Sequence, residues 1–213
     1  TELGRRVVRR IAVALLSGGL DSTVVSACAK NQADSLTSLT FHYGQANQRE
    51  IQSARKVSEL LGINHKVVDI SSFKDVAWFS ALTNETQFPI PTKHVTGRPT
   101  ETSENPNDSV PITYVPMRNT FFLAMAGALL ESEALSSIES DNIPPKDLKA
   151  TLFIAPNAID YSGYPDCRPE YYTAMRETMM MGSKLWAQYK VPIAIETPII
   201  HLAKHEIIKL GMD

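Results

Sequence analysis

One segment near the amino terminus constrains the fold of this chain more than any other. An unbroken apolar run occupies 11–16 and stops at Ser17-Gly18-Gly19. From Leu20 to Cys28, apolar residues recur at helical spacing. An apolar run without alternation is typical of a strand buried on both faces of a parallel sheet. The segment therefore predicts a strand, a glycine turn and a helix.

Similar units follow along the chain. Four further strands are predicted at 36–43, 65–70, 152–155 and 192–197, and further helices at 51–62, 119–135, 167–188 and 204–210. Strands that alternate with helices imply right-handed crossovers and a parallel sheet. We therefore expect one α/β domain over 1–213, with a five-stranded parallel sheet and helices on both faces.

Two stretches interrupt this alternation. Six of the 13 prolines fall between positions 89 and 116. Because proline disfavours regular structure, 71–113 is predicted to be an insertion loop or lid. The polar stretch 136–149 is predicted to be a second insertion, a mobile surface connection.

Composition narrows the class of protein. Hydrophobic residues make up 43% of the sequence and charged residues 21%, which is ordinary for a globular chain. The net charge of −2 provides no overall basic field that would attract a nucleic-acid backbone. The longest apolar run, 121–130, is shorter than the roughly 20 residues that cross a bilayer, and no signal peptide is recognisable. Two cysteines, Cys28 and Cys167, can form neither a disulfide framework nor a four-thiolate zinc site. We expect a cytoplasmic protein that binds neither membrane nor nucleic acid.

The glycine turn carries the chemistry of a phosphate site. Glycines let the backbone approach a ligand closely, and the hydroxyls of Ser17 and Ser22 lie beside a helix N-terminus that attracts anions. No Gly-Lys pair of a Walker A loop and no GxGxxG motif occurs. The alternative for such a turn is an ordinary bend with a serine helix cap.

The letters SGGxDS at 17–22 resemble the motif of the PP-loop ATP pyrophosphatases, whose fold is like that of the adenine nucleotide alpha hydrolases. The resemblance implies that this turn binds ATP, whose α-phosphate is attacked by a substrate oxygen so that AMP and pyrophosphate are formed. It implies that Asp21 also helps to hold Mg²⁺ and that Asp21 and Ser22 take part in catalysis. The ATP-binding residues that it implies are Ser17, Gly18, Gly19, Leu20, Asp21, Ser22 and His42.

Three further segments make the resemblance specific to one family. They are FHYGQ at 41–45, YVPMRN at 114–119 and NAIDYSGYPDCR at 157–168, and each follows a predicted strand or opens a predicted helix. Open α/β sheets bind ligands at such positions. Together with the glycine turn, these segments resemble the 7-cyano-7-deazaguanine synthases of queuosine biosynthesis. The resemblance implies an ATP-dependent C–N ligase that converts 7-carboxy-7-deazaguanine and ammonia to the nitrile by adenylating first the carboxylate and then the amide.

The same resemblance implies a substrate site. Asp160 and Asp166 are expected to accept hydrogen bonds from the guanine-like N–H edge, Arg118 to bind a carboxylate or phosphate, and Tyr161 and Tyr164 to stack on the base. The remaining expected members are Asn119 and Ser162, and Lys204 is expected to reach the ATP phosphates as a catalytic residue. Each of these has an ordinary alternative, because Arg-Asn is a common helix start and the aspartates lie in turn dipeptides. His201 and His205 share a helical face, but no further metal-ligand motif accompanies them.

Some features depart from that family. Its members continue into a cysteine cluster that binds structural zinc, so Zn²⁺ is expected from the resemblance, but the cluster is not present in this sequence. Met117 stands where the family often has a small residue. Two alternatives stay open: a related enzyme that adenylates another carboxylate, a tRNA base or a protein amine, and a non-catalytic ATP-binding subunit. A homodimer also stays open.

Overall fold

Five parallel strands form the centre of the fold, in the order β3-β2-β1-β4-β5. The computed structural model describes residues 8–43, 48–80, 82, 110–111, 113–159 and 163–212. The predicted five-stranded parallel sheet is confirmed. The strands are β1 (Arg9–Leu15), β2 (Ser35–His42), β3 (Asn64–Asp69), β4 (Leu148–Phe153) and β5 (Ile193–Glu196).

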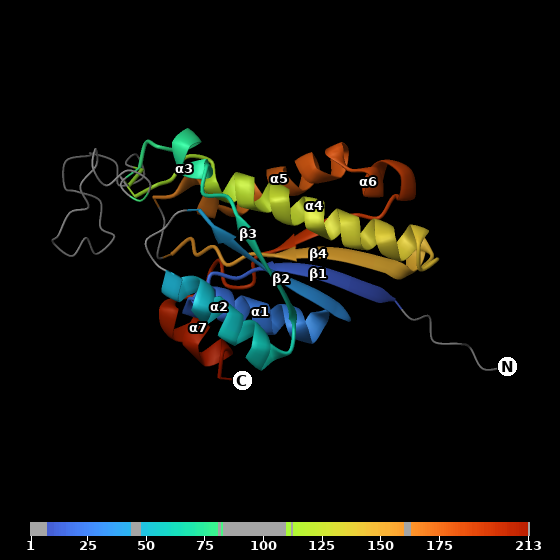
Figure 1. Ribbon diagram of the computed structural model, residues 1–213, viewed down its shortest axis with the longest axis horizontal. Coiled ribbons are helices and arrows are strands. Elements are labelled where there is room, and N and C mark those ends of the chain that lie inside the picture. The colour runs from blue at the N-terminus through green and yellow to red at the C-terminus, as the bar shows by residue number, and fades with distance from the viewer. Residues whose placement is uncertain are drawn as a thin grey trace.

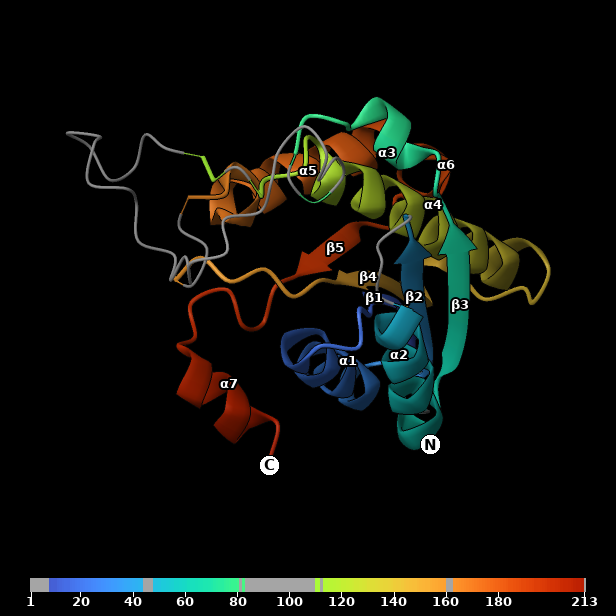
Figure 2. The same cartoon turned by 60° about the vertical axis from the view of Figure 1, so that its left-hand side comes forward.

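Helices cover both faces of the sheet, as Figures 1 and 2 show. On one face lie α1 (Leu20–Gln32), α2 (Gln48–Leu61) and α7 (Lys204–Leu210). On the other lie α3 (Phe73–Val76), α4 (Arg118–Glu139), α5 (Pro169–Gly182) and α6 (Lys184–Tyr189). This arrangement is the one expected from crossover connections between parallel strands.

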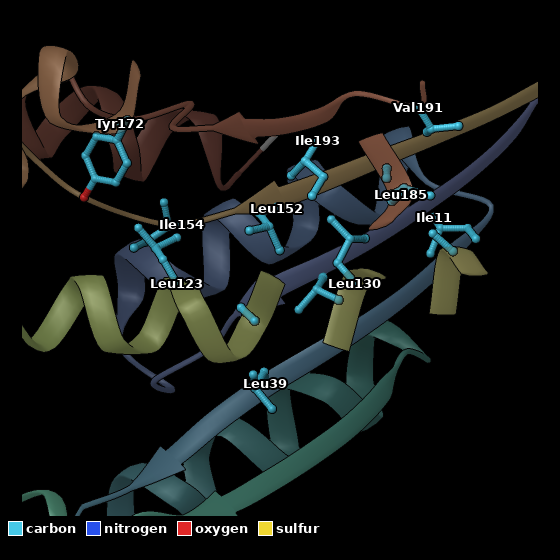
Figure 3. Packing of buried hydrophobic residues seen from close by; sticks show 14 of the residues in the cluster. Ile11, Leu39, Leu123, Leu130, Leu152, Ile154, Tyr172, Leu185, Val191 and Ile193 are labelled. Atoms are coloured by element: carbon cyan, nitrogen blue, oxygen red, sulfur yellow. The ribbon is translucent and has the colours of Figure 1, made fainter. Parts of the chain in front are cut away.

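The core is divided into two layers by β1. Val13 belongs to a cluster on the α4 side with Leu39, Leu123 and Leu152, and Figure 3 shows several members of this cluster, among them Ile154 and Ile193. Ala14 packs on the other side, in a cluster that includes residues of α1 and α7. Both Val13 and Ala14 are completely buried, which explains why the run at 11–16 is apolar without alternation.

Three segments differ in detail from the prediction. The helix expected to end at 135 continues to Glu139, and β4 already begins at Leu148, so the stretch 136–149 is only partly a loop. The helix expected over 167–188 is two helices, because the hydroxyl of Ser183 accepts a hydrogen bond from the Trp186 backbone N–H and caps α6. Within 71–113 the structure places the short helix α3, while 83–109 lie outside the described residues.

Helix α4 is long and apolar enough to span a membrane, by length and composition alone. The contiguous run at 121–130 did not indicate this, because the helix continues well beyond it. In the fold α4 packs across β1 and β4, and Leu123, Ala126 and Leu130 are fully buried there. The apolar composition of α4 is therefore used by the core.

Candidate functional site

A cleft of about 580 Å³ opens at the carboxyl ends of β1, β2 and β4. The glycine turn at 17–19 and the first turn of α1 line one side of it, and the start of α4 lines another. The segments that follow β4 and precede α7 complete the wall with Asn157, Asp166 and Lys204. The topology thus brings together most of the residues predicted to bind ATP and substrate.

Gly18 is held in a position that no other residue fits. Its φ of +82° lies in the left-handed region, and a Cβ there would lie 2.6 Å from the Glu50 carbonyl oxygen and 2.7 Å from the Ala54 nitrogen. The hydroxyl of Ser53 donates to the Gly18 carbonyl at 2.8 Å. The turn is therefore fixed against α2, with its shape set by the missing side chain.

The two serines of the turn brace each other. The hydroxyl oxygens of Ser17 and Ser22 lie 3.0 Å apart, and the Ser17 backbone N–H donates to Ser22 Oγ at 3.2 Å. Ser22 Oγ also donates to the Gly19 carbonyl at 3.0 Å. Gly19 is the N-cap of α1 and no side-chain cap bonds its first turn. The first turn of α1 therefore has backbone N–H groups that donate to no carbonyl inside the helix. These groups lie at the wall of the cleft.

An ion pair joins the glycine turn to the far end of the chain. Lys204 Nζ lies 2.6 Å from Asp21 Oδ1, although the two residues are 183 positions apart. Lys204 is the first residue of α7, which packs beside α1 (Figure 2). One cationic and one anionic group thus face the same end of the cleft.

The donor set at this end fits magnesium better than zinc. Asp21 offers a single carboxylate, and Mg²⁺ is commonly held by one or two carboxylates together with phosphate oxygens and water. Zinc needs several nitrogen or sulfur ligands. In the part of the chain that the structure describes, no group of three or more His, Cys, Asp or Glu side chains is placed to hold a metal ion.

Asp166 and the start of α4 form the opposite end of the cleft. Asp166 is 7% exposed, and burial raises the pKa of its carboxyl group, while the charge of Arg118 and the backbone N–H of Asn119 oppose that rise. The Tyr172 hydroxyl donates to the Asp166 carbonyl at 2.7 Å and fixes the backbone. A carboxylate in this position has a cationic neighbour and faces a cavity that a ligand could fill.

The remaining predicted residues divide into three groups. Tyr164 lines the cleft and its hydroxyl forms a hydrogen bond with that of Thr113. His42 is not among the described residues that line the cleft; its Nδ1 lies 3.4 Å from Asp69 Oδ2 on β3. Asp160, Tyr161 and Ser162 lie outside the described residues, so their roles stay predictions.

The sequence reasoning missed three contributions to the cleft. Phe41 and Phe122 stack with their ring centroids 4.3 Å apart and provide an apolar wall. Cys167 also lines the cleft, where burial and the charge of Asp166 raise the pKa of its thiol to about 11, so it is a neutral group at pH 7. Asn157 is 1% exposed. Its position directly after a predicted strand was a signal that could have identified it.

Comparison with known proteins adds to this geometry. The profile of the family described as "Queuosine biosynthesis protein QueC" matches residues 11–213. A protein of Thermoplasma volcanium named 7-cyano-7-deazaguanine synthase is 37% identical over 201 residues, covering 94% of this chain and 72% of that protein. One of the same name from Syntrophus aciditrophicus is 39% identical over 204 residues, covering 96% and 78%.

Similarity to solved structures is weaker. A predicted subunit of a tRNA methyltransferase from Methanocaldococcus jannaschii has a TM-score of 0.46 and 12% identity, covering 96% of this chain and 75% of that one. Similarity at this level carries no conclusion about function.

Proposed function

Because this chain belongs to the family of the queuosine biosynthesis protein QueC, we propose that it acts as a 7-cyano-7-deazaguanine synthase. The resemblance predicted from the glycine turn and the segment 157–168 is confirmed at the level of the family. The proposed reaction converts 7-carboxy-7-deazaguanine and ammonia to the nitrile, and it consumes ATP and releases AMP and pyrophosphate.

The reaction requires two activations of the same carbon. A carboxylate oxygen attacks the α-phosphorus of ATP and pyrophosphate leaves; ammonia then displaces AMP, loses a proton and gives the amide. The amide oxygen attacks a second ATP in the same way. The adenylated amide nitrogen then loses both of its protons as AMP leaves, and this forms the carbon–nitrogen triple bond. One nitrile therefore costs two ATP, and both activations need the same contacts with phosphate.

The residues at the glycine turn are suited to bind the phosphates of ATP. The N–H groups of the first turn of α1 would bind the leaving pyrophosphate, and Lys204 would add a positive charge there. Asp21 would hold Mg²⁺, which supplies further positive charge beside the departing group. Ser17 and Ser22, which bond each other, would keep the turn in shape for both adenylation steps.

The residues at the opposite end of the cleft are suited to bind the deazaguanine. Asp166 would accept hydrogen bonds from the N–H edge of the base, and such bonds favour its charged form against the cost of burial. Arg118 would bind the carboxylate that is to be activated. Phe41 and Phe122 would contact the face of a planar ring. The observation that carries the proposal is that one cleft is lined both by the glycine turn with the first turn of α1 and by Asp166 and Arg118.

The proposal is tested by incubating the protein with 7-carboxy-7-deazaguanine, ATP, Mg²⁺ and ammonium. We expect the nitrile and two AMP per nitrile, measured by chromatography with mass detection. Asp166→Asn should lower kcat/KM for the deazaguanine at least tenfold, because it removes a charged acceptor. Lack of both nitrile and AMP would refute the proposal, and substrate-dependent AMP formation with a different acceptor would favour the alternative of another adenylating enzyme.

A further inference from the structure

One buried side chain joins two segments of the chain that lie beside the cleft. Asn157 follows β4, and its Nδ2 donates to the Leu202 carbonyl at 2.8 Å, across 45 positions of the chain. Its Oδ1 accepts from the Ile159 backbone N–H at 2.9 Å. The side chain thus uses both its donor and its acceptor on the backbone of two different segments.

Leu202 lies two residues before Lys204, so this contact acts on the approach to α7. A second bond supports the connection, because the Ala158 N–H donates to the Ile200 carbonyl at 2.9 Å. After Leu202 the chain enters α7 at once, and Glu206 Oε2 accepts from the Ala203 N–H at 2.7 Å. The first residue of that helix is Lys204, which pairs with Asp21.

The other side of α7 is fixed independently of Asn157. Ile207 is fully buried against the α1 face of the sheet, and a Cβ on Gly211 would lie 2.8 Å from Val24 Cγ2. Packing therefore determines how α7 lies on α1. The turn at 199–203 leads into the helix, and the side chain of Asn157 joins it by a hydrogen bond to the segment that follows β4.

We propose that Asn157 is a positioning residue, which sets the place of Lys204 at the phosphate end of the cleft through its bond to Leu202. This inference rests on the proposed function, because it takes Lys204 to contact the phosphates of ATP. Asn157 touches neither phosphate nor Mg²⁺ in this proposal; it acts through the turn that leads into α7. A neutral, fully buried amide serves here because both of its polar groups have backbone partners.

The test is a double-mutant cycle on the affinity for ATP with Mg²⁺, measured by calorimetry. Asn157→Ser keeps a hydroxyl that can accept from the Ile159 N–H, but it is too short to reach the Leu202 carbonyl. It also adds no charge near the phosphates. We expect Asn157→Ser to raise Kd about tenfold in the otherwise unchanged protein and less than twofold when Lys204→Met is already present.

The matched control is Ser58→Ala in α2. Ser58 is 2% exposed and donates to the Ala54 carbonyl, so this change removes a comparable buried hydrogen bond without touching the turn at 199–203. Its Kd for ATP should stay within twofold of the unchanged protein. Circular dichroism and urea unfolding show whether each variant is folded; if Asn157→Ser is not, Asn157→Thr enters the same cycle.

Two results overturn the inference. One is an equal effect of Asn157→Ser with and without Lys204→Met, which would mean that Asn157 acts independently of the lysine. The other is a change below twofold in the otherwise unchanged protein. If the unchanged protein binds no ATP, the proposed function itself fails, and this outcome is distinct from the other two.

Discussion

Gly18 is the residue at which the glycine turn tolerates substitution least. We expect Gly18→Ala to destabilise the protein by about 2 kcal/mol or more, because the left-handed backbone and the contact with α2 both oppose a methyl group. Gly19→Ala is the matched control, since among the described residues the nearest atom to its Cβ would be Ser17 Oγ, at an ordinary contact distance of 3.6 Å. Urea unfolding of the two variants measures the difference. Equal losses would contradict the role assigned to the packing of Gly18.

Met117 is a residue other than glycine whose backbone conformation would suit glycine. Its φ is 57°, and its side chain is 60% exposed as the N-cap of α4. Met117→Gly should therefore stabilise the protein, by up to about 1 kcal/mol, because relief of the left-handed strain outweighs the added entropy of the unfolded chain.

The control for Met117 is Asn142→Gly. Asn142 has a similar φ of 59°, but asparagine tolerates this region better, so little gain is expected. Thermal unfolding of both variants checks the comparison. A loss of stability in Met117→Gly would show that the methionine side chain makes a contribution larger than its exposure suggests.

At the scale of elements, a pair of residues fixes the start of β1 to the turn before β2. Arg10 donates to Asp34 from its backbone N–H at 2.8 Å and from its guanidinium Nη2 at 2.8 Å. These bonds, the guanidinium first, hold the pKa of the Asp34 carboxyl below its usual value. A carboxyl group whose pKa is lower in the folded state stabilises the protein at neutral pH and loses that contribution as the pH falls through the folded-state pKa.

Asp34→Asn should therefore lower stability at pH 7 and make no difference once the pH is below the pKa of Asp34 in the folded state. The effect should be small and should decrease in high salt, because both side chains are partly exposed. Urea unfolding at pH 7 and at successively lower pH values measures it. A difference between the two proteins that stays the same as the pH falls would contradict this account.

The boundaries of elements were the least predictable part of the fold. The strands and their parallel direction followed from apolar runs that alternate with segments of helical spacing, whereas the order of the strands in the sheet did not. The break between α5 and α6 at Ser183 was not predictable, because the residues on both sides of Gly182 and Ser183 have a helical pattern. The cap becomes evident only in the structure, where the Ser183 hydroxyl accepts a hydrogen bond from the Trp186 backbone N–H. The continuation of α4 to Glu139 depends on the burial of Ser137 and Ile138. The polar residues around them in the sequence do not indicate that burial.

At the scale of the whole molecule, the place of the cleft was predictable and its internal contacts were not. Parallel strands put Asp21, Arg118 and Asp166 at one edge of the sheet, as the sequence indicated. The partner of Asp21 could not be inferred, because nothing local relates position 21 to position 204. The contact of His42 with Asp69 on β3 could not be inferred from the same rule, and the proposed contact of His42 with ATP stays a prediction.

The ion pair between Asp21 and Lys204 has a consequence for how the protein is made. A ribosome delivers the chain in order, so the glycine turn emerges long before the lysine that faces it, 183 positions later. Until α7 has left the exit tunnel, the carboxylate of Asp21 lacks its cationic neighbour. This ion pair can therefore form only after all five strands of the sheet have been synthesised.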